Sequence, residues 1–179
     1  MTETALRDLD EDRAARLDEA GTAWSGTIAK NPASAKLTFK ITGEGTGPVA
    51  TRVTAGKHEF SVDEPAALAG EDTAASPVEY ALGALISCQV VVYRLYAHQL
   101  GIRFDEIDID AEGDLDVRGL FGADETVRPG FSEVRLTVSI TGPESQERYE
   151  ELGRTEEARC PVQDIFANHT PVTARVVKK

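Results

Sequence analysis

The chain is poor in sulfur, aromatic side chains and positive charge. It has two cysteines, one methionine and one tryptophan, and 6% of its 179 residues are aromatic. A chain of this length can bury a core without disulfide staples. Lys and Arg number 19 against 31 Asp and Glu, a formal charge of −12. Because such a surface repels phosphate backbones and anionic lipids, we expect neither nucleic acid nor a membrane as a partner.

The sequence also lacks a visible targeting segment. Residues 1–20 are rich in Asp and Glu and contain no apolar signal core, so we expect no secretory signal. No run approaches the roughly 20 apolar residues that a membrane span needs. We therefore expect a cytoplasmic protein. In a reducing cytosol, cysteine pairs are more often catalytic or metal-binding than structural.

The first third of the chain changes character near residue 20. Residues 1–20 are interpreted as an acidic N-terminal arm with a weak helical stripe of leucines, and residues 21–179 as a single domain. Period-two alternation and the turn signal Ala55-Gly56 predict strands after the arm. The predicted strands are 22–28, 36–42, 49–54 and 58–62.

The strongest local signal is a helix start at Ser76. Pro77 suits the first helical position, and Glu79 at the third completes a capping box. The pattern predicts a helix to about Leu100 that stops at Gly101. Its middle is apolar almost all round, which indicates a place in a core or an interface.

Strands and helices follow in separate runs rather than in alternation. Strands, a long helix, strands, helices and a final strand indicate an α+β fold. The strands expected here are 106–111, with an extension over 114–117 after a kink at Gly113, then 134–140 and 172–177; the helices are 143–158 and 161–168.

Cys88 and Cys160 are 72 positions apart, each at a place unusual for a structural disulfide. Cys160 precedes a proline at the mouth of a short helix, where the helix dipole and Arg159 favour a thiolate. Cys88 lies in the apolar helix, which disfavours its charged form. A free cysteine often simply packs, so the residues alone leave both a redox pair and inert packing open.

At these residues the chain resembles the OsmC/Ohr family of thiol-dependent hydroperoxide reductases. The similar segments are 76–88 ending in Cys88, the connector 113–119 with 127–131, and Cys160-Pro161-Val162. The resemblance implies an intertwined homodimer in which antiparallel sheets are wrapped around long central helices. It also implies that the active sites lie at the subunit interface.

The resemblance implies a mechanism as well. Cys88 attacks an organic hydroperoxide and becomes a sulfenic acid, and Cys160 resolves it to a Cys88–Cys160 disulfide. An external dithiol, often lipoyl-like, then restores both thiols. The expected activity is an antioxidant one in stress response, the reduction of organic hydroperoxides to alcohols without a metal or bound cofactor.

Two positions depart from the family pattern. Family reductases activate the attacking thiol with a glutamate and an arginine, but the glutamate position here is Val78. Glu79 is one residue on, which turns a helix by about 100°, and the capping box is its alternative role. Arg52 and Arg128 are the candidate arginines. If neither reaches Cys88, the alternative function is a non-catalytic or redox-sensing binding protein with the same fold.

Other residue groups give weaker signals. Phe121, Phe131 and Phe166 are candidates for an apolar substrate pocket, with core packing as the alternative. The three histidines have no metal-ligand spacing with either cysteine, so no metal site is predicted. The acidic run 144–157 is interpreted as a solvated helix face.

Overall fold

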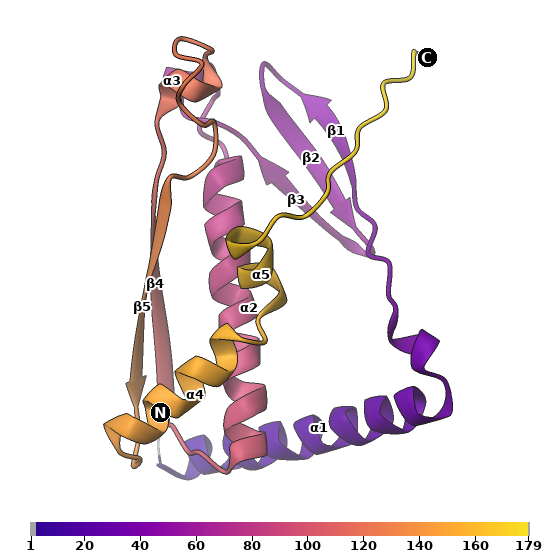
Figure 1. Cartoon of the computed structure of the whole chain (residues 1–179), viewed down its shortest axis with the longest axis vertical. Helices are drawn as coiled ribbons and strands as arrows, with labels where there is room; N and C mark the ends of the chain where they lie inside the picture. Colours follow the sequence, from indigo (N-terminus) through magenta and orange to yellow (C-terminus); the bar gives the residue numbers. More distant parts are fainter. Residues whose placement is uncertain (1–2, 179) are drawn as a thin grey trace. The chain divides into compact units, whose positions relative to one another are not determined.

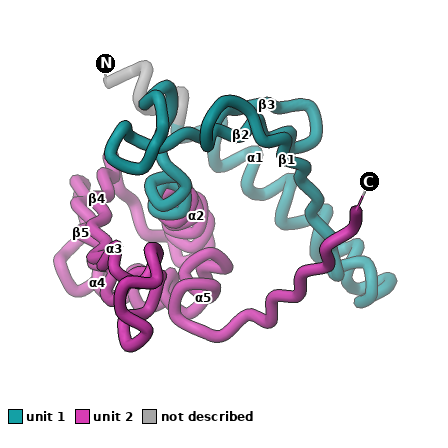
Figure 2. Tube along the Cα trace, turned by 90° about the horizontal axis from the view of Figure 1, so that it is seen from above, with its two compact units in different colours: residues 1–83 teal, residues 84–179 magenta. Residues whose placement is uncertain are grey.

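The computed structural model describes residues 3–178, with side chains from Asp10 onward. The chain divides into two compact units, unit 1 up to Gly83 and unit 2 from Ala84 (Figures 1 and 2). The boundary falls inside the long helix α2, Pro77–Leu100, which begins in unit 1 and ends in unit 2.

Unit 1 combines a long helix with a three-stranded antiparallel sheet of order β1-β2-β3. The predicted strands at 49–54 and 58–62 are confirmed, and Gly56 at φ +63° makes the turn between them. The elements are α1 (Glu3–Lys30), η1 (Pro32–Ala35), β1 (Thr42–Thr46), β2 (Ala50–Ala55), β3 (His58–Val62) and η2 (Ala66–Leu68).

Two predicted strands of unit 1 are wrong. Residues 22–28 continue helix α1, which crosses residue 20 without a break and ends at Lys30. No proline precedes Pro32, so α1 runs through Gly21 and Gly26 to Lys30, and the Asn31 side chain then accepts a hydrogen bond from the Ala33 N–H as the cap of η1. Residues 36–41 lie outside the strands although Leu37, Phe39 and Ile41 alternate, and these three side chains are exposed. In the described chain this segment pairs with no strand, so alternation alone does not make it one.

A buried carboxylate organises the loop between β3 and α2. Asp63 accepts the backbone N–H groups of Glu64, Glu71 and Thr73 at 2.9, 3.2 and 3.1 Å and the Thr73 hydroxyl at 2.8 Å. These bonds, first that of the Thr73 N–H, hold the pKa of Asp63 below its ordinary value. Gly70 fits because a Cβ there would lie 1.7 Å from the Glu64 carbonyl oxygen. The loop is thus fixed by hydrogen bonds rather than by apolar packing.

Helix α2 starts as the sequence predicts. The Glu79 carboxylate accepts hydrogen bonds from the Ser76 backbone N–H and hydroxyl, both at 2.7 Å, which is the reciprocal contact of a capping box. Tyr80 in the next position donates its hydroxyl to the Ser61 carbonyl at 2.8 Å. The helix ends at Leu100, and Gly101 follows at φ +62°.

Among the described helices, α2 is by length and composition apolar enough to cross a membrane. The expectation that no segment comes near such a length of apolar sequence is therefore wrong for α2. A helix packed in a protein core has the same composition, and Leu85, Val92 and Ala97 of α2 are buried in unit 2.

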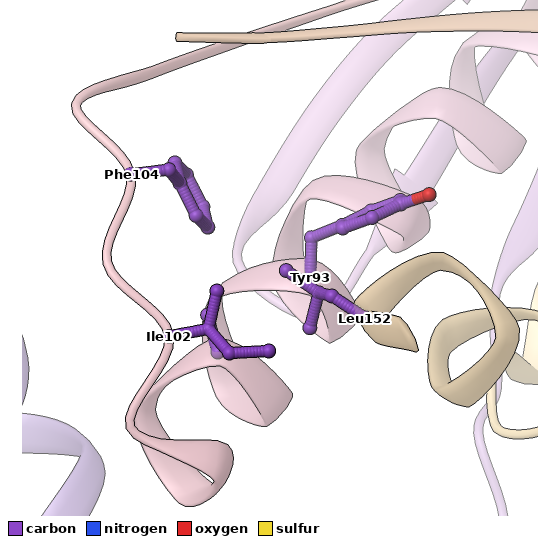
Figure 3. Packing of buried hydrophobic residues seen from close by; sticks show 5 residues of the cluster. Tyr93, Ile102, Phe104 and Leu152 are labelled. Carbon is purple, nitrogen blue, oxygen red and sulfur yellow. The ribbon is translucent and has the colours of Figure 1, made fainter. Parts of the chain in front are cut away.

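Unit 2 packs α2 and α4 against a long hairpin. Tyr93 and Ala97 of α2, Ile102 and Phe104 after it, and Leu152 of α4 form the buried cluster (Figure 3). Alternate side chains of the hairpin strands pack on this cluster. The elements are β4 (Glu106–Asp114), α3 (Val117–Leu120), β5 (Glu133–Thr141), α4 (Gln146–Glu157) and α5 (Pro161–Ala167).

The predicted elements of unit 2 are confirmed except at two places. Strand β4 continues through Gly113 to Asp114 without a kink, and 117–120 is helical rather than extended. The Phe131 ring lies against Gly113, where an added Cβ would be 2.6 Å from its Cε1 atom. Residues 172–177 alternate but form no strand, since no described strand lies beside them, and Val176 is 98% exposed.

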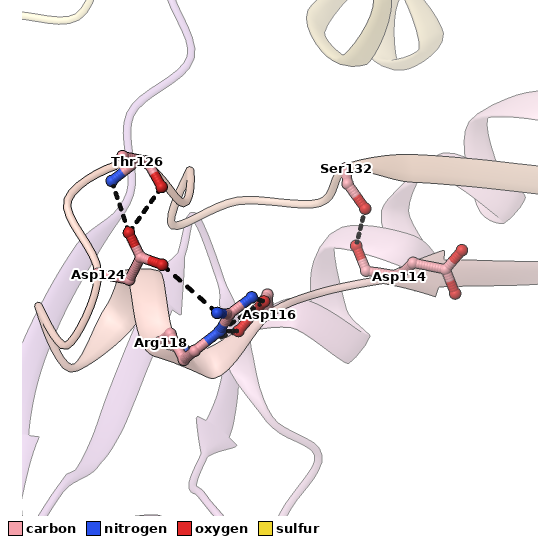
Figure 4. Close-up of polar contacts among 6 residues, drawn as sticks. All are labelled: Asp114, Asp116, Arg118, Asp124, Thr126 and Ser132. Carbon is pink, nitrogen blue, oxygen red and sulfur yellow. Dashed lines mark hydrogen bonds and ion pairs between the residues drawn. The ribbon is translucent and has the colours of Figure 1, made fainter.

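Polar contacts order the connector between β4 and β5. Arg118 pairs with Asp116, which caps α3, and reaches Asp124 at 3.4 Å (Figure 4). Asp124 also accepts a hydrogen bond from the Thr126 N–H at 3.0 Å, and the Ser132 hydroxyl donates one to the Asp114 carbonyl at 3.2 Å. The connector that carries Phe121 and Arg128 is therefore held by local bonds.

Candidate functional site

The structure brings the two cysteines of unit 2 together. Cys88 on α2 and Cys160 at the N-cap of α5 are both free thiols, and they lie close enough for Cys88 to raise the pKa of Cys160. One residue along α2, the buried Gln89 donates its Nε2 to the Gln163 Oε1 at 2.5 Å. This bond holds α5 against α2, so residues far apart in sequence present both sulfur atoms at one place.

The two thiols differ in exposure and in the state of their protons. Cys88 is half-buried, whereas Cys160 is only 2% exposed. The pKa of Cys160 is raised to about 12, mainly by burial and in smaller part by Cys88 and Glu156, while the Gln163 backbone N–H lowers it in part. The sequence-based expectation of an activated thiolate at Cys160 is therefore wrong, because burial outweighs its place before a helix.

A third ionisable group, Glu156, lies in contact with Cys160. Its side chain is buried, and its Oε1 atom has no hydrogen-bond partner. Burial raises the pKa of this carboxyl, the Cys160 contact lowers it in part, and the Glu157 charge raises it. Burial, followed by the charges of Glu156 and Glu157, raises the pKa of Tyr93 to about 12.

The sequence prediction missed Glu156 because it lies in the acidic run interpreted as a solvated helix face. Tyr149, Leu152 and Glu156 are three and four residues apart, so they share one face of α4. That face packs into the core of unit 2, with Leu152 fully buried. The Glu156 carbonyl also accepts the Cys160 N–H at 2.9 Å, which turns the chain toward α5. The sequence did contain a signal for a buried Glu156. It is an apolar stripe on one helix face that ends in this glutamate, four residues before Cys160.

A pocket of about 480 Å³ opens beside Cys160, at the turn between α4 and α5. Its polar lining favours a ligand with hydrogen-bonding groups over a purely apolar one. The lining residues are Glu157, Ala158, Arg159, Cys160, Pro161, Gln163, Asp164, Ala167 and Asn168.

The three candidate phenylalanines do not line this pocket. The Phe131 and Phe166 rings stack on each other with centroids 6.4 Å apart. Phe121 is 67% exposed in the connector. Phe131 is half-buried and Phe166 is 36% exposed, so the stacked pair lies outside the buried core, and a substrate-binding role for any of the three stays a prediction.

The candidate activating residues lie elsewhere. The Glu79 carboxylate is engaged by Ser76 at the start of α2, and Val78 beside it is exposed. Arg52 is an exposed residue of β2 in unit 1. Arg128 is exposed in the connector of unit 2, with its guanidinium beside Gly130. A catalytic role for Glu79, Arg52 or Arg128 stays a prediction. Among the described side chains, those of residues 10–178, no three His, Cys, Asp or Glu groups converge as metal ligands would.

Comparison with known proteins links this geometry to one family. The family model described as OsmC-like protein matches residues 70–175, which include both cysteines and Glu156. Among proteins of curated function, no relative matches the chain.

Solved structures share the fold at low sequence identity. An OsmC-like protein from Mycoplasma pneumoniae is 17% identical, with a TM-score of 0.64 over 73% of this chain and 88% of the other. An organic hydroperoxide resistance protein from Legionella pneumophila is 22% identical, with a TM-score of 0.58 over 74% and 91%. The organic hydroperoxide resistance protein OhrB of Bacillus subtilis is 21% identical, with a TM-score of 0.52 over 73% and 91%.

Proposed function

Because this chain belongs to the OsmC-like protein family, we propose that it is a thiol-dependent peroxidase that reduces organic hydroperoxides to alcohols. The observation that carries the proposal is the placement of two free thiols at one site, Cys88 on α2 and Cys160 at the N-cap of α5, where the Gln89–Gln163 hydrogen bond joins the two helices. Two solved structures with the same fold are named organic hydroperoxide resistance proteins, which supports the substrate class.

The unequal settings of the two thiols support a division of labour. Cys88, the more exposed thiol, attacks the peroxide, so the O–O bond breaks, an alcohol leaves and Cys88 becomes a sulfenic acid. Cys160, buried and protonated at rest, then attacks the Cys88 sulfur to form a disulfide with loss of water. An external dithiol reduces the disulfide and completes the cycle.

We also propose that the working form is a homodimer. Leu37, Phe39 and Ile41 alternate like a strand but are exposed, and the segment 172–177 has the same character. Within the described part of unit 1, Val53 is the buried apolar side chain. A second copy that pairs with these segments would cover the exposed apolar side chains and supply a larger core.

A redox-sensing or non-catalytic relative is the second candidate function. The observation that favours it is the capping box, in which the Glu79 carboxylate is already bonded to Ser76. Such a protein keeps the cysteine pair without the group that activates Cys88 in family reductases. Its two thiols would be oxidised slowly by peroxide, and each molecule would react only once.

A steady-state assay with cumene hydroperoxide and a dithiol tests the proposal. We expect multiple turnovers for the unchanged protein, a fall to the uncatalysed background for Cys88→Ser, and arrest after one turnover for Cys160→Ser. Full turnover in Cys88→Ser contradicts the proposal. Slow peroxide-driven loss of both free thiols, without turnover, favours the redox-sensing relative instead.

A further inference from the structure

We propose that Glu156 is a catalytic residue that accepts the proton of Cys160 as the Cys88–Cys160 disulfide closes. This inference rests on the proposed function for its place in the reaction, since disulfide closure is the step that follows oxidation of Cys88. The observations behind it are that Glu156 and Cys160 are both 2% exposed, that the Cys160 N–H donates to the Glu156 carbonyl at 2.9 Å, and that the buried Glu156 Oε1 atom has no hydrogen-bond partner.

The geometry places a proton acceptor where the reaction needs one. Cys160 is a nucleophile only after it loses its proton, yet burial keeps that proton in place. The Glu156 carboxylate lies near enough to the thiol for each group to shift the pKa of the other, and its Oε1 atom has no partner within the described chain. A carboxylate whose pKa is raised by burial is also a stronger base than one in water.

The titratable groups around Glu156 come from two elements. Cys160 and Glu157 act on it from its own segment, and Tyr93 faces it from α2. Cys88, also on α2, acts on Cys160. Tyr93 holds its proton because its pKa is about 12, so among these groups the Glu156 carboxylate, whose pKa is raised by burial, is the candidate proton acceptor.

The closing step balances with Glu156 as acceptor. The Cys160 sulfur attacks the Cys88 sulfenic sulfur, so an S–S bond forms and the S–O bond breaks. The Cys160 sulfur is oxidised, the Cys88 sulfur is reduced, and hydroxide is the leaving group. The Cys160 proton passes to the Glu156 carboxylate and from there to the hydroxide, which departs as water.

A structural role for the same carboxylate predicts the opposite effect. If Glu156 only holds the proton on Cys160 through its charge, its removal lowers the pKa of Cys160 and speeds closure. If Glu156 accepts the proton in the transition state, its removal slows closure by about 10² to 10⁴-fold. The sign of the change in rate therefore distinguishes the two roles.

The experiment uses the full chain and needs no hydroperoxide. An aromatic disulfide reagent of the dithionitrobenzoate type first forms a mixed disulfide on the more exposed Cys88. Cys160 then displaces the coloured thiolate, and its release in stopped flow gives the rate of closure. The variants are Glu156→Gln, which keeps the shape without the base, and Glu156→Asp, which keeps the base. Glu150→Gln, an exposed position of α4, is the matched control.

We expect Glu156→Gln to close about 10²-fold slower or more, Glu156→Asp to recover part of the rate, and Glu150→Gln to match the unchanged protein. An unchanged or faster rate in Glu156→Gln overturns the proposal. Slow closure in Glu156→Gln together with no peroxide turnover in the unchanged protein refutes only the proposed function.

The pH dependence of the closing rate in the unchanged protein gives a second test, which does not depend on whether any variant folds. With Glu156 as acceptor, the closing rate rises as this carboxyl ionises and then levels off well below pH 12. A rate that climbs about tenfold per pH unit toward the pKa of Cys160, without a plateau, contradicts the proposal.

Discussion

Asp63 in unit 1 and Glu156 in unit 2 are buried to the same extent, each 2% exposed, yet their surroundings are opposite. Asp63 accepts four hydrogen bonds from the loop that it organises. The Glu156 side chain lies beside the Cys160 thiol, and its Oε1 atom has no hydrogen-bond partner. Hydrogen bonds lower the pKa of Asp63, while burial raises that of Glu156.

The comparison teaches that burial alone does not decide what a carboxylate does. A buried carboxylate whose oxygens all accept hydrogen bonds is a fixed anion, and those bonds define the backbone around it. A buried carboxylate with an unpartnered oxygen destabilises the fold as an anion and readily takes up a proton. Glu156 lies beside a reactive thiol, and this position gives its unsatisfied oxygen a chemical use.

The largest effect is expected from Asp63→Ala. Three backbone N–H groups lose their acceptor, so the loop 63–73 should lose its fixed conformation. Hydrogen exchange should show the amides of Glu71 and Thr73 losing protection down to the level of exposed loops. Glu71→Ala, which removes an exposed side chain of the same loop, is the control. Retained protection at both amides in Asp63→Ala would show that Asp63 does not organise the loop.

The next effect is the opposite pH dependence of the two carboxylates. The pKa of Asp63 is lowered in the folded state, so its stabilisation is present above about pH 4 and is lost as the pH falls below that. The pKa of Glu156 is raised, so its stabilisation is complete below about pH 4 and is lost as the pH rises through the folded-state value.

Glu156→Gln should therefore be more stable than the unchanged protein at neutral pH, by about 1–3 kcal/mol, and the difference should vanish near pH 4. Urea unfolding between pH 4 and pH 8 measures this. A difference independent of pH would mean that Glu156 is not destabilised as an anion. Asp63→Asn should be less stable than the unchanged protein at neutral pH, and this difference in unfolding free energy should shrink as the pH falls below about 4.

The smallest effect concerns Gln89, a buried polar group of unit 2 that does have a hydrogen-bond partner. Gln89→Leu removes the donor to Gln163 and should cost about 1 kcal/mol in unfolding free energy. The double variant Gln89→Leu with Gln163→Leu removes both partners and should recover most of this loss. If the double variant is no more stable than the single one, the partnered contact is not what stabilises this region.

Local signals in the sequence predicted much of the fold. Helix α2 followed from Ser76, Pro77 and Glu79, whose capping contacts lie within one turn. The position of Cys160 before Pro161 placed the N-cap of α5. Alternation predicted β5 because its apolar side chains pack on the buried cluster of unit 2.

The failures came from information that is not local. Alternation at 36–42 and 172–177 predicted strands, but a strand also needs a neighbour, and the described chain offers none there. The pKa of Cys160 depends on burial by residues from other elements, so its helix position gave the wrong direction. Glu156 was taken for a surface residue because the acidic residues around it masked the buried face that it shares with Leu152.

Cys88 and Cys160 act as a redox pair only if their sulfur atoms can meet, and peptide mass spectrometry after treatment with one equivalent of an organic hydroperoxide detects whether they do. We expect a Cys88–Cys160 disulfide in the full chain, formed quickly and reversed by a dithiol. Both cysteines recovered as free thiols, or Cys88 driven to sulfinic acid while Cys160 stays reduced, would contradict it.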